Sequence, residues 1–273
     1  DSVASRGLGD VYKRQLQMGI KIIRCIWGAR HTEEIERATQ ISREFGLLPE
    51  DQLVYCWDQD NLDFVQKLGY QTQYMGDNTI GWEGWFINKL IAFRLSSLTG
   101  PFLYLDWDCI QQRPLDSNFW SSLEKGKAIQ MPLYYFPQKA IQKFQTITPF
   151  IEEEGLEKTH YFNLMMYQIL RYGKWEYDGG LAIPNAGFVY SRQPSFPHDL
   201  FKIFKERTIT TNIEELCAML YFNRYIHSVD EYIDKVEPKV CIGKSDGDMW
   251  ASQYILNNYI NSKASKDIYF IHE

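Results

Sequence analysis

Short apolar runs alternate with helical segments along the first part of the chain. The apolar runs are rich in β-branched and aromatic residues, and they are Ile20–Trp27, Gln52–Trp57, Tyr70–Met75 and Phe102–Leu105. The segments between them have apolar residues at helical spacing, and they are Thr32–Gly46, Asn61–Leu68 and Gly81–Leu98. Because strands that alternate with helices pair in parallel, this order predicts an α/β fold with a mostly parallel sheet and helices on both faces.

The rest of the chain continues without a visible boundary between domains. Its expected strands are Ala128–Phe136, Leu181–Ser191 with an interruption at Pro184, and Asp267–Glu273. Its expected helices are Phe162–Tyr172, Phe196–Arg207, Ile213–Phe222 and a last one from Asp248 to Tyr259. No internal repeat occurs, and no linker rich in Gly, Ser or Pro divides the sequence. We therefore expect one domain over residues 16–273.

Residues 1–15 need a separate interpretation. The hexamer from Asp10 to Gln15, "DVYKRQ", is also what the DNA sequence GATGTGTATAAGAGACAG encodes, which resembles a transposase adapter of sequencing libraries. We interpret residues 1–15 as a non-native remnant and expect the native chain to begin near Met18. Whether the sequence is also truncated after Glu273 is left open.

The composition narrows the class of protein. A formal net charge of −6 and a pI near 5.5 argue against a nucleic-acid partner, which requires a basic face. No apolar run approaches the roughly 18 residues of a membrane span, so only peripheral contact of exposed aromatic residues with a membrane stays open. The five cysteines are scattered and form no Cys-x-x-Cys pair, which predicts buried thiols and a cytoplasmic location.

Two aspartates follow the most apolar of the predicted strands, in "FLYLDWDCI". In an extended chain Asp106 and Asp108 would point to one side and Trp107 to the other. Ligands of parallel sheets bind outside the carboxyl ends of the strands, and carboxylate oxygens suit Mg²⁺ or Mn²⁺. The pattern therefore predicts a metal site, with a solvated or capped loop as the alternative.

Three motifs resemble one known family. "KLIAFRLSSLTGPFLYLDWDCI", "PNAGFVYS" and the late "YFIHE" are similar to nucleotide-sugar glycosyltransferases of the GT-A fold, above all to the group of glycogenin and bacterial lipopolysaccharide galactosyltransferases (glycosyltransferase family 8). The resemblance covers about residues 18–273 as an ordered set of short motifs. It implies that Asp106 and Asp108 hold Mn²⁺ or Mg²⁺, which binds the donor diphosphate, and that His272 is a third ligand.

The chain departs from the family at two of these motifs. Trp107 stands between the aspartates where members often have a small residue, and the chain stops after Glu273 without the Gly and Lys-Pro-Trp run that usually follows the histidine. These departures bear on the metal site and on the role of His272, for which an exposed or hydrogen-bonded side chain is the alternative.

The resemblance also assigns roles around the donor. Lys89 shares a predicted helix face with Trp85 and Phe93. The family has a basic residue in this helix that contacts the donor phosphate. As an alternative, the amine of Lys89 could simply extend outward along the apolar surface. Asn185 and Gly187 correspond to the strand that lines the sugar, although Asn and Gly also suit a plain turn.

Two further regions are matched by the resemblance alone. The turn after the first strand, with Trp27, Ala29 and Arg30, corresponds to the nucleotide-base pocket, although Trp27 could equally be a core residue. Asp248 corresponds to an acid that faces the sugar; it could also cap the last helix, and Asp246 competes for the same role.

The function expected from these features is transfer of a sugar from a nucleoside-diphosphate sugar to a hydroxyl of a glycan, lipopolysaccharide or capsule acceptor. The resemblance leans towards retention of anomeric configuration. One alternative is a haloacid-dehalogenase-like phosphatase with Asp106 as nucleophile, although such enzymes usually carry that residue on the first strand. A second alternative is an inactive domain that binds sugar nucleotides without turnover.

Overall fold

The computed structural model describes six main segments, residues 19–28, 32–77, 85–136, 180–207, 213–238 and 240–243, together with 268–272 at the end of the chain. Residues 138, 142, 167–168, 170–171 and 175–177 are described as well. The proposed remnant at residues 1–15 and the helix expected from Asp248 lie outside the described residues. Of the helix expected over Phe162–Tyr172, the four described residues 167–168 and 170–171 are helical.

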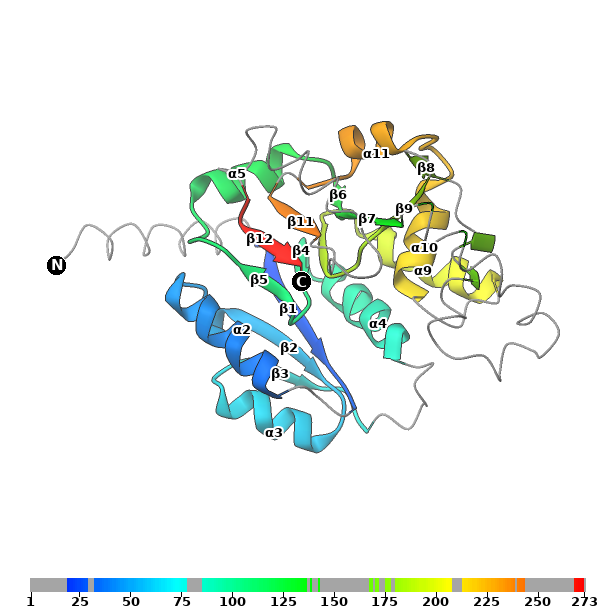
Figure 1. Ribbon diagram of the computed structural model, residues 1–273. Coiled ribbons are helices and arrows are strands. Elements are labelled where there is room, and N and C mark those ends of the chain that lie inside the picture. Colours follow the sequence, from blue (N-terminus) through cyan, green and yellow to red (C-terminus); the bar gives the residue numbers. More distant parts are fainter. Residues whose placement is uncertain are drawn as a thin grey trace.

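A six-stranded sheet forms the centre of the molecule (Figure 1). Its order is β3 (Gln71–Tyr74), β2 (Gln52–Cys56), β1 (Lys21–Ile26), β4 (Phe102–Leu105), β10 (Phe188–Ser191) and β6 (Ile129–Gln130). The first four strands pair in parallel, and β10 is antiparallel to both of its neighbours. This topology confirms the predicted α/β class with a mostly parallel sheet.

The apolar strands are buried on both faces because helices cover both faces. On β1, Ile23 and Cys25 enter one core and Ile22 and Ile26 point to the other side, as alternation along a strand requires. The first core is covered by α4 (Trp85–Ser97), α9 (Ser195–Glu206) and α10 (Ile213–Phe222). The other side is covered by α2 (Thr32–Glu44), α3 (Gln59–Lys67) and α5 (Ser117–Lys125) (Figure 1).

Two small sheets extend the structure beyond the central sheet. One contains β11 (Cys241–Gly243), β12 (Phe270–His272) and β5 (Cys109–Gln111), and the other contains β7 (Leu133–Phe136), β9 (Gly180–Pro184) and β8 (Glu176–Tyr177). A short helix, α11 (Val229–Lys235), and a 3₁₀ turn, η1 (Pro49–Asp51), complete the described elements.

Two predicted strands are each divided between sheets. The strand expected over Ala128–Phe136 splits into β6 and β7, and the one expected over Leu181–Ser191 splits into β9 and β10. Prolines cause both breaks: Pro132 lies between β6 and β7, and Pro184 ends β9. The chain segments at the two breaks are hydrogen-bonded to each other: the backbone amide of Asn185 donates to the carbonyl of Pro132 over 2.8 Å.

All five cysteines are buried free thiols, as the sequence predicts. Within the part of the chain that the structure describes, no helix combines the length and apolar character needed to cross a membrane.

Asp116 joins a helix to the end of the chain, and this joint can be tested. Its Oδ1 accepts from the amides of Asn118 and Phe119 at the start of α5 and from the Tyr269 hydroxyl at 2.5 Å. We expect Asp116→Ala to lower the free energy of unfolding by about 1–2 kcal/mol, because both the cap and the tether are lost. Denaturant unfolding measures this; Asp116→Asn, which retains an acceptor, should lose less, and equal losses would contradict the cap.

Candidate active site

The central sheet changes direction between β1 and β4. From β1 the chain proceeds outward through β2 and β3, whereas β4 lies on the other side of β1, so the carboxyl ends of β1 and β4 border a topological switch point. Asp106 directly follows β4, and Gly187 precedes the antiparallel β10 at the same edge. The amide of Asp106 donates to the carbonyl of Gly187 over 2.8 Å. Ligands of open α/β sheets bind at this position.

The chain turns sharply at the two aspartates. The amide of Cys109 donates to the carbonyl of Asp106 over 3.1 Å, which closes a turn over Asp106–Cys109 and leads into β5. The expectation that Asp106 and Asp108 lie side by side on an extended strand is therefore wrong. They flank a turn instead, and the strand itself ends at Leu105.

Trp107 has a structural role in this turn. Its indole Nε1 donates to the carbonyl of Cys25 over 2.8 Å, and its ring packs edge-on against Tyr70 with centroids 5.5 Å apart. Trp107 thus contacts the α2–α3 side of the sheet, while the Asp106 carboxylate contacts α4. Asp106 and Trp107 therefore point in opposed directions although the chain is not extended, and the contacts of the indole explain a large residue between the aspartates.

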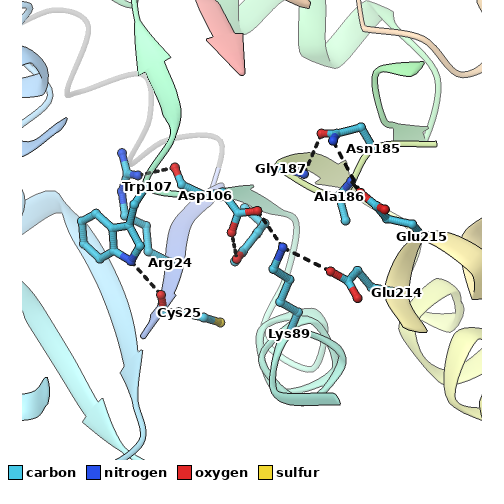
Figure 2. A network of polar contacts seen from close by, with 11 residues as sticks. Arg24, Cys25, Lys89, Asp106, Trp107, Asn185, Ala186, Gly187, Glu214 and Glu215 are labelled. Atoms are coloured by element: carbon cyan, nitrogen blue, oxygen red, sulfur yellow. Dashed lines mark hydrogen bonds and ion pairs between the residues drawn. The ribbon is translucent and has the colours of Figure 1, made fainter. Parts of the chain in front are cut away.

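Arg24 supports the same turn from β1. Arg24 is 1% exposed, and its Nη1 donates to the carbonyl of Asp106 over 2.7 Å (Figure 2). Its Nε donates to Gln52 Oε1 over 2.9 Å, and its guanidinium carbon lies 4.8 Å from the Trp107 ring centre. A buried guanidinium is costly unless its donors are satisfied, so these contacts fix both Arg24 and the turn.

Lys89 of α4 reaches the Asp106 carboxylate. Its Nζ donates to Oδ2 over 2.6 Å, and the Tyr104 hydroxyl donates to Oδ1 of the same carboxylate. The side chain of Lys89 is only 10% exposed and that of Asp106 is 20% exposed. Lys89 therefore does not extend outward to solvent but points into the sheet edge, next to the predicted metal site (Figure 2).

A second carboxylate shares Lys89. Glu214 Oε1, in the first turn of α10, lies 3.2 Å from Nζ, and Glu214 Oε2 is buried without a hydrogen-bond partner among the described residues. Burial raises the pKa of Glu214 to about 7, against the opposing effect of Lys89. Burial lowers the pKa of Lys89, but the carboxylates of Asp106 and Glu214 outweigh it and raise that pKa well above its ordinary value.

The next acid, Glu215, holds the turn between β9 and β10. Its Oε1 accepts from the Asn185 side-chain amide at 3.4 Å and from the amide of Ala186 at 3.2 Å. The Asn185 side-chain oxygen accepts from the amide of Gly187 at 2.8 Å, and Asn185 is 1% exposed. Both polar ends of the Asn185 side chain are thus engaged within the protein, in an arrangement that orients Gly187 towards Asp106.

Neither Glu214 nor Glu215 was identified from the sequence as a site residue. The available signal was a pair of acids at the start of an apolar helix, which is also the ordinary way to complement a helix dipole. Only the packing of α10 against α4 brings the two acids to the sheet edge.

The remaining predicted residues are described to different extents. The backbone of His272 pairs with Cys109, so strand β12 brings this residue next to Asp108 in the register. Trp27 is half-buried against the core, with its ring centre 6.4 Å from that of Trp57. Ala29, Arg30, Asp248 and the side chain of His272 lie outside the described part of the structure.

The oxygen ligands available at this edge of the sheet suit a hard divalent cation. Asp106 and Asp108 supply carboxylate oxygens, the ligands that Mg²⁺ and Mn²⁺ prefer, and each oxygen of Asp106 retains acceptor capacity beyond its one hydrogen bond. Among the described residues no group of three or more His, Cys, Asp or Glu residues forms a metal cluster. Any further metal ligand would therefore be a group other than the described His, Cys, Asp and Glu side chains.

Comparison with known proteins gives distant structural similarities only. No protein-family model matches the chain, and no curated protein sequence matches it. Mouse xyloside xylosyltransferase 1 in its apo form is 9% identical with a TM-score of 0.43, over 93% of this chain and 97% of that one. The bifunctional glycosyltransferase WbbM is 9% identical with a TM-score of 0.47, over 93% of this chain and 45% of that one.

A glycosyltransferase involved in glycosylation of the major capsid of PBCV-1 is 11% identical, with a TM-score of 0.38 over 93% of this chain and 92% of that one. The sheet topology, rather than these similarities, defines the fold of the chain.

Removing the ammonium group of Lys89, which Asp106 and Glu214 share, should destabilise the fold. In Lys89→Met, measured above pH 7 where Glu214 of the wild type is ionised, Asp106 and Glu214 lose the charge that compensates their burial, and we expect the free energy of unfolding to fall by about 3 kcal/mol. Adding Glu214→Gln to this variant should recover part of the loss in denaturant unfolding. Lys67→Met, at an exposed position of α3, is the control and should change little; similar losses in both single variants would contradict a stabilising role of the shared lysine.

Glu214 should also make stability depend on pH. The folded carboxyl keeps its proton up to about pH 7, whereas the unfolded one releases it near 4.5, so the folded state binds more protons and stability falls as the pH rises through this window. Glu214→Gln should remove this trend, which amounts to about 3 kcal/mol in all. Unfolding at several pH values measures it, with the exposed Glu36→Gln as control; parallel pH profiles of wild type and Glu214→Gln would rule out the raised pKa.

Proposed function

We propose that the chain is a metal-dependent glycosyltransferase of the GT-A, family 8-like type, which moves a sugar from a nucleoside-diphosphate sugar to an acceptor hydroxyl. One observation carries the proposal: the Asp-x-Asp turn, Lys89 and the turn at Gly187 meet at the switch point of a mostly parallel sheet. The family resemblance of the motifs assigns donor binding to the same residues.

Departure of the diphosphate is the step that this arrangement would assist. Negative charge builds on the leaving group as the bond to the sugar breaks, and a fixed positive charge lowers the barrier without any reorganisation. A Mn²⁺ or Mg²⁺ ion held by Asp106 and Asp108 would supply most of that charge. Lys89 already lies 2.6 Å from Asp106, in a site that is mostly shielded from water, and would add to the positive field.

Retention of anomeric configuration is part of the proposal. An inverting enzyme needs a carboxylate base that reaches the acceptor hydroxyl. Among the described acids near the site, Asp106 contacts Lys89 and Tyr104, Glu214 contacts Lys89, and Glu215 contacts the Asn185 turn. These contacts favour positioning roles over proton abstraction. The acceptor we propose is a glycan, lipopolysaccharide or capsule hydroxyl.

The proposal can be tested by thermal shift with a panel of nucleoside-diphosphate sugars, with and without Mn²⁺. One donor at about one hundred times its dissociation constant should stabilise the protein by about 2.7 kcal/mol, which corresponds to roughly 5 °C, only when the metal is present. Asp108→Asn should abolish this shift, and Asp60→Asn, at an exposed position of α3, should leave it unchanged.

The same experiment separates the alternatives when product analysis is added. Transfer or hydrolysis of the stabilising donor supports the transferase, and binding without turnover indicates an inactive sugar-nucleotide domain. Phosphate release from a simple phosphoester that is lost in Asp106→Asn would favour the phosphatase. The transferase proposal fails if no nucleotide sugar stabilises the protein with any divalent metal.

A further inference from the structure

The turn after β1 is held by side chains of another segment. Gly28 has a φ of 60°, and its amide donates to Asp58 Oδ2 over 3.0 Å. Its carbonyl accepts from the Asn61 side-chain amide at 3.3 Å, and that amide also donates to Asp58 Oδ2 at 3.3 Å and to the carbonyl of Trp57 at 2.8 Å. Both backbone polar groups of Gly28 are therefore bound by the start of α3.

Asp58 adopts an unusual backbone conformation in order to do this. Its φ is 73°, and among the described residues no other non-glycine residue has a positive φ. Asp58 occupies the N-cap position of α3, yet its side chain caps no amide of that helix. An aspartate there would ordinarily bond the helix amides, so the carboxylate is directed to Gly28 instead. Strained conformations of this kind persist where the surrounding structure requires them, commonly at binding sites.

The location connects this contact with the candidate site. β1 and β2 are adjacent and parallel, with Ile26 opposite Cys56, so Gly28 and Asp58 leave the sheet at the same edge. β1 is also the strand next to β4, which ends at Asp106. The loop after β1 therefore starts at the switch point, where ligands of such sheets bind.

We infer that Asp58 and Asn61 are positioning residues that fix the turn at Gly28, at the carboxyl end of β1, in the conformation that receives the nucleoside part of the donor. The inference rests on the proposed function for the identity of the ligand. Its physical basis is that a backbone turn whose amide and carbonyl are already held, as at Gly28, loses less conformational entropy when the ligand arrives. A purely structural role, in which the contacts only join β1 to α3, is the alternative.

Three substitutions of Asp58 separate the two roles. Asp58→Asn keeps an acceptor oxygen and the backbone strain of the wild type, Asp58→Ala removes the acceptor and keeps the strain, and Asp58→Gly removes the acceptor and relieves the strain. We expect Asp58→Gly to melt at or above the temperature of Asp58→Ala. We also expect both to bind nucleoside diphosphate about tenfold more weakly than wild type, and Asp58→Asn to bind within about threefold of it.

The measurement is calorimetric titration with UDP, GDP, ADP, CDP and dTDP, each with Mn²⁺, together with hydrogen exchange of the Gly28 amide in the free protein. Faster exchange at Gly28 in Asp58→Ala and Asp58→Gly, with weaker binding in both, supports the inference. Wild-type affinity in Asp58→Gly overturns it, since the side chain would then be dispensable, and so does an Asp58→Asn variant as weak as Asp58→Ala.

Failure of the proposed function gives a different result. If wild type binds none of the five diphosphates, the transferase proposal and the ligand assigned to this loop fall together. If wild type binds one of them and all three variants bind it equally well, the transferase proposal stands and only the positioning role of Asp58 is overturned.

Discussion

The ion pair between Lys89 and Asp106 is the interaction on which the candidate site depends. It joins α4 to the end of β4, and through Glu214 it also joins α10 to both. Lys89 and Glu214 are buried and the Asp106 side chain is only 20% exposed, so the charges of Lys89 and Asp106 would each be costly without the other. The helices on this face must therefore dock in one relative position, because the lysine reaches both carboxylates only from there.

Asp106 is held from both faces of the sheet. On one face, Lys89 and Tyr104 bind its carboxylate; on the other, Arg24 and Trp107 fix the turn that follows. Glu215 orders the turn at Asn185, and the Gly187 carbonyl of this turn accepts a hydrogen bond from the amide of Asp106. Such a residue has little freedom to reorganise, which is the property that electrostatic stabilisation of a developing charge requires.

The regular elements were predicted well where one periodic pattern extended over several residues. β4 and α10 have the predicted bounds, and β1, β2 and α2 differ only at their ends. The strands β5 and β11 were missed because a strand of three residues carries too short a pattern. Two missed helices did have signals. Asp116 caps α5, and at the start of α11 the Ser228 hydroxyl accepts from the amide of Glu231, whose carboxylate accepts from the amide of His227.

The sequence by itself determined the order of strands and helices and the apolar strand that ends in Asp106, because these follow from local spacing. The family resemblance, rather than spacing, assigned Lys89 to the same site, and its contact with Asp106 joins a helix to a strand. Only the tertiary structure decided that the chain turns between Asp106 and Cys109, that Glu214 shares Lys89, and that Asp58 holds Gly28. The contacts of Glu214 and Asp58 join segments that are far apart in the chain, and the turn after Asp106 is itself held by Arg24 and Cys25 of β1. Their partners are selected by helix packing and by the need to satisfy buried polar groups, neither of which leaves a periodic trace in the sequence.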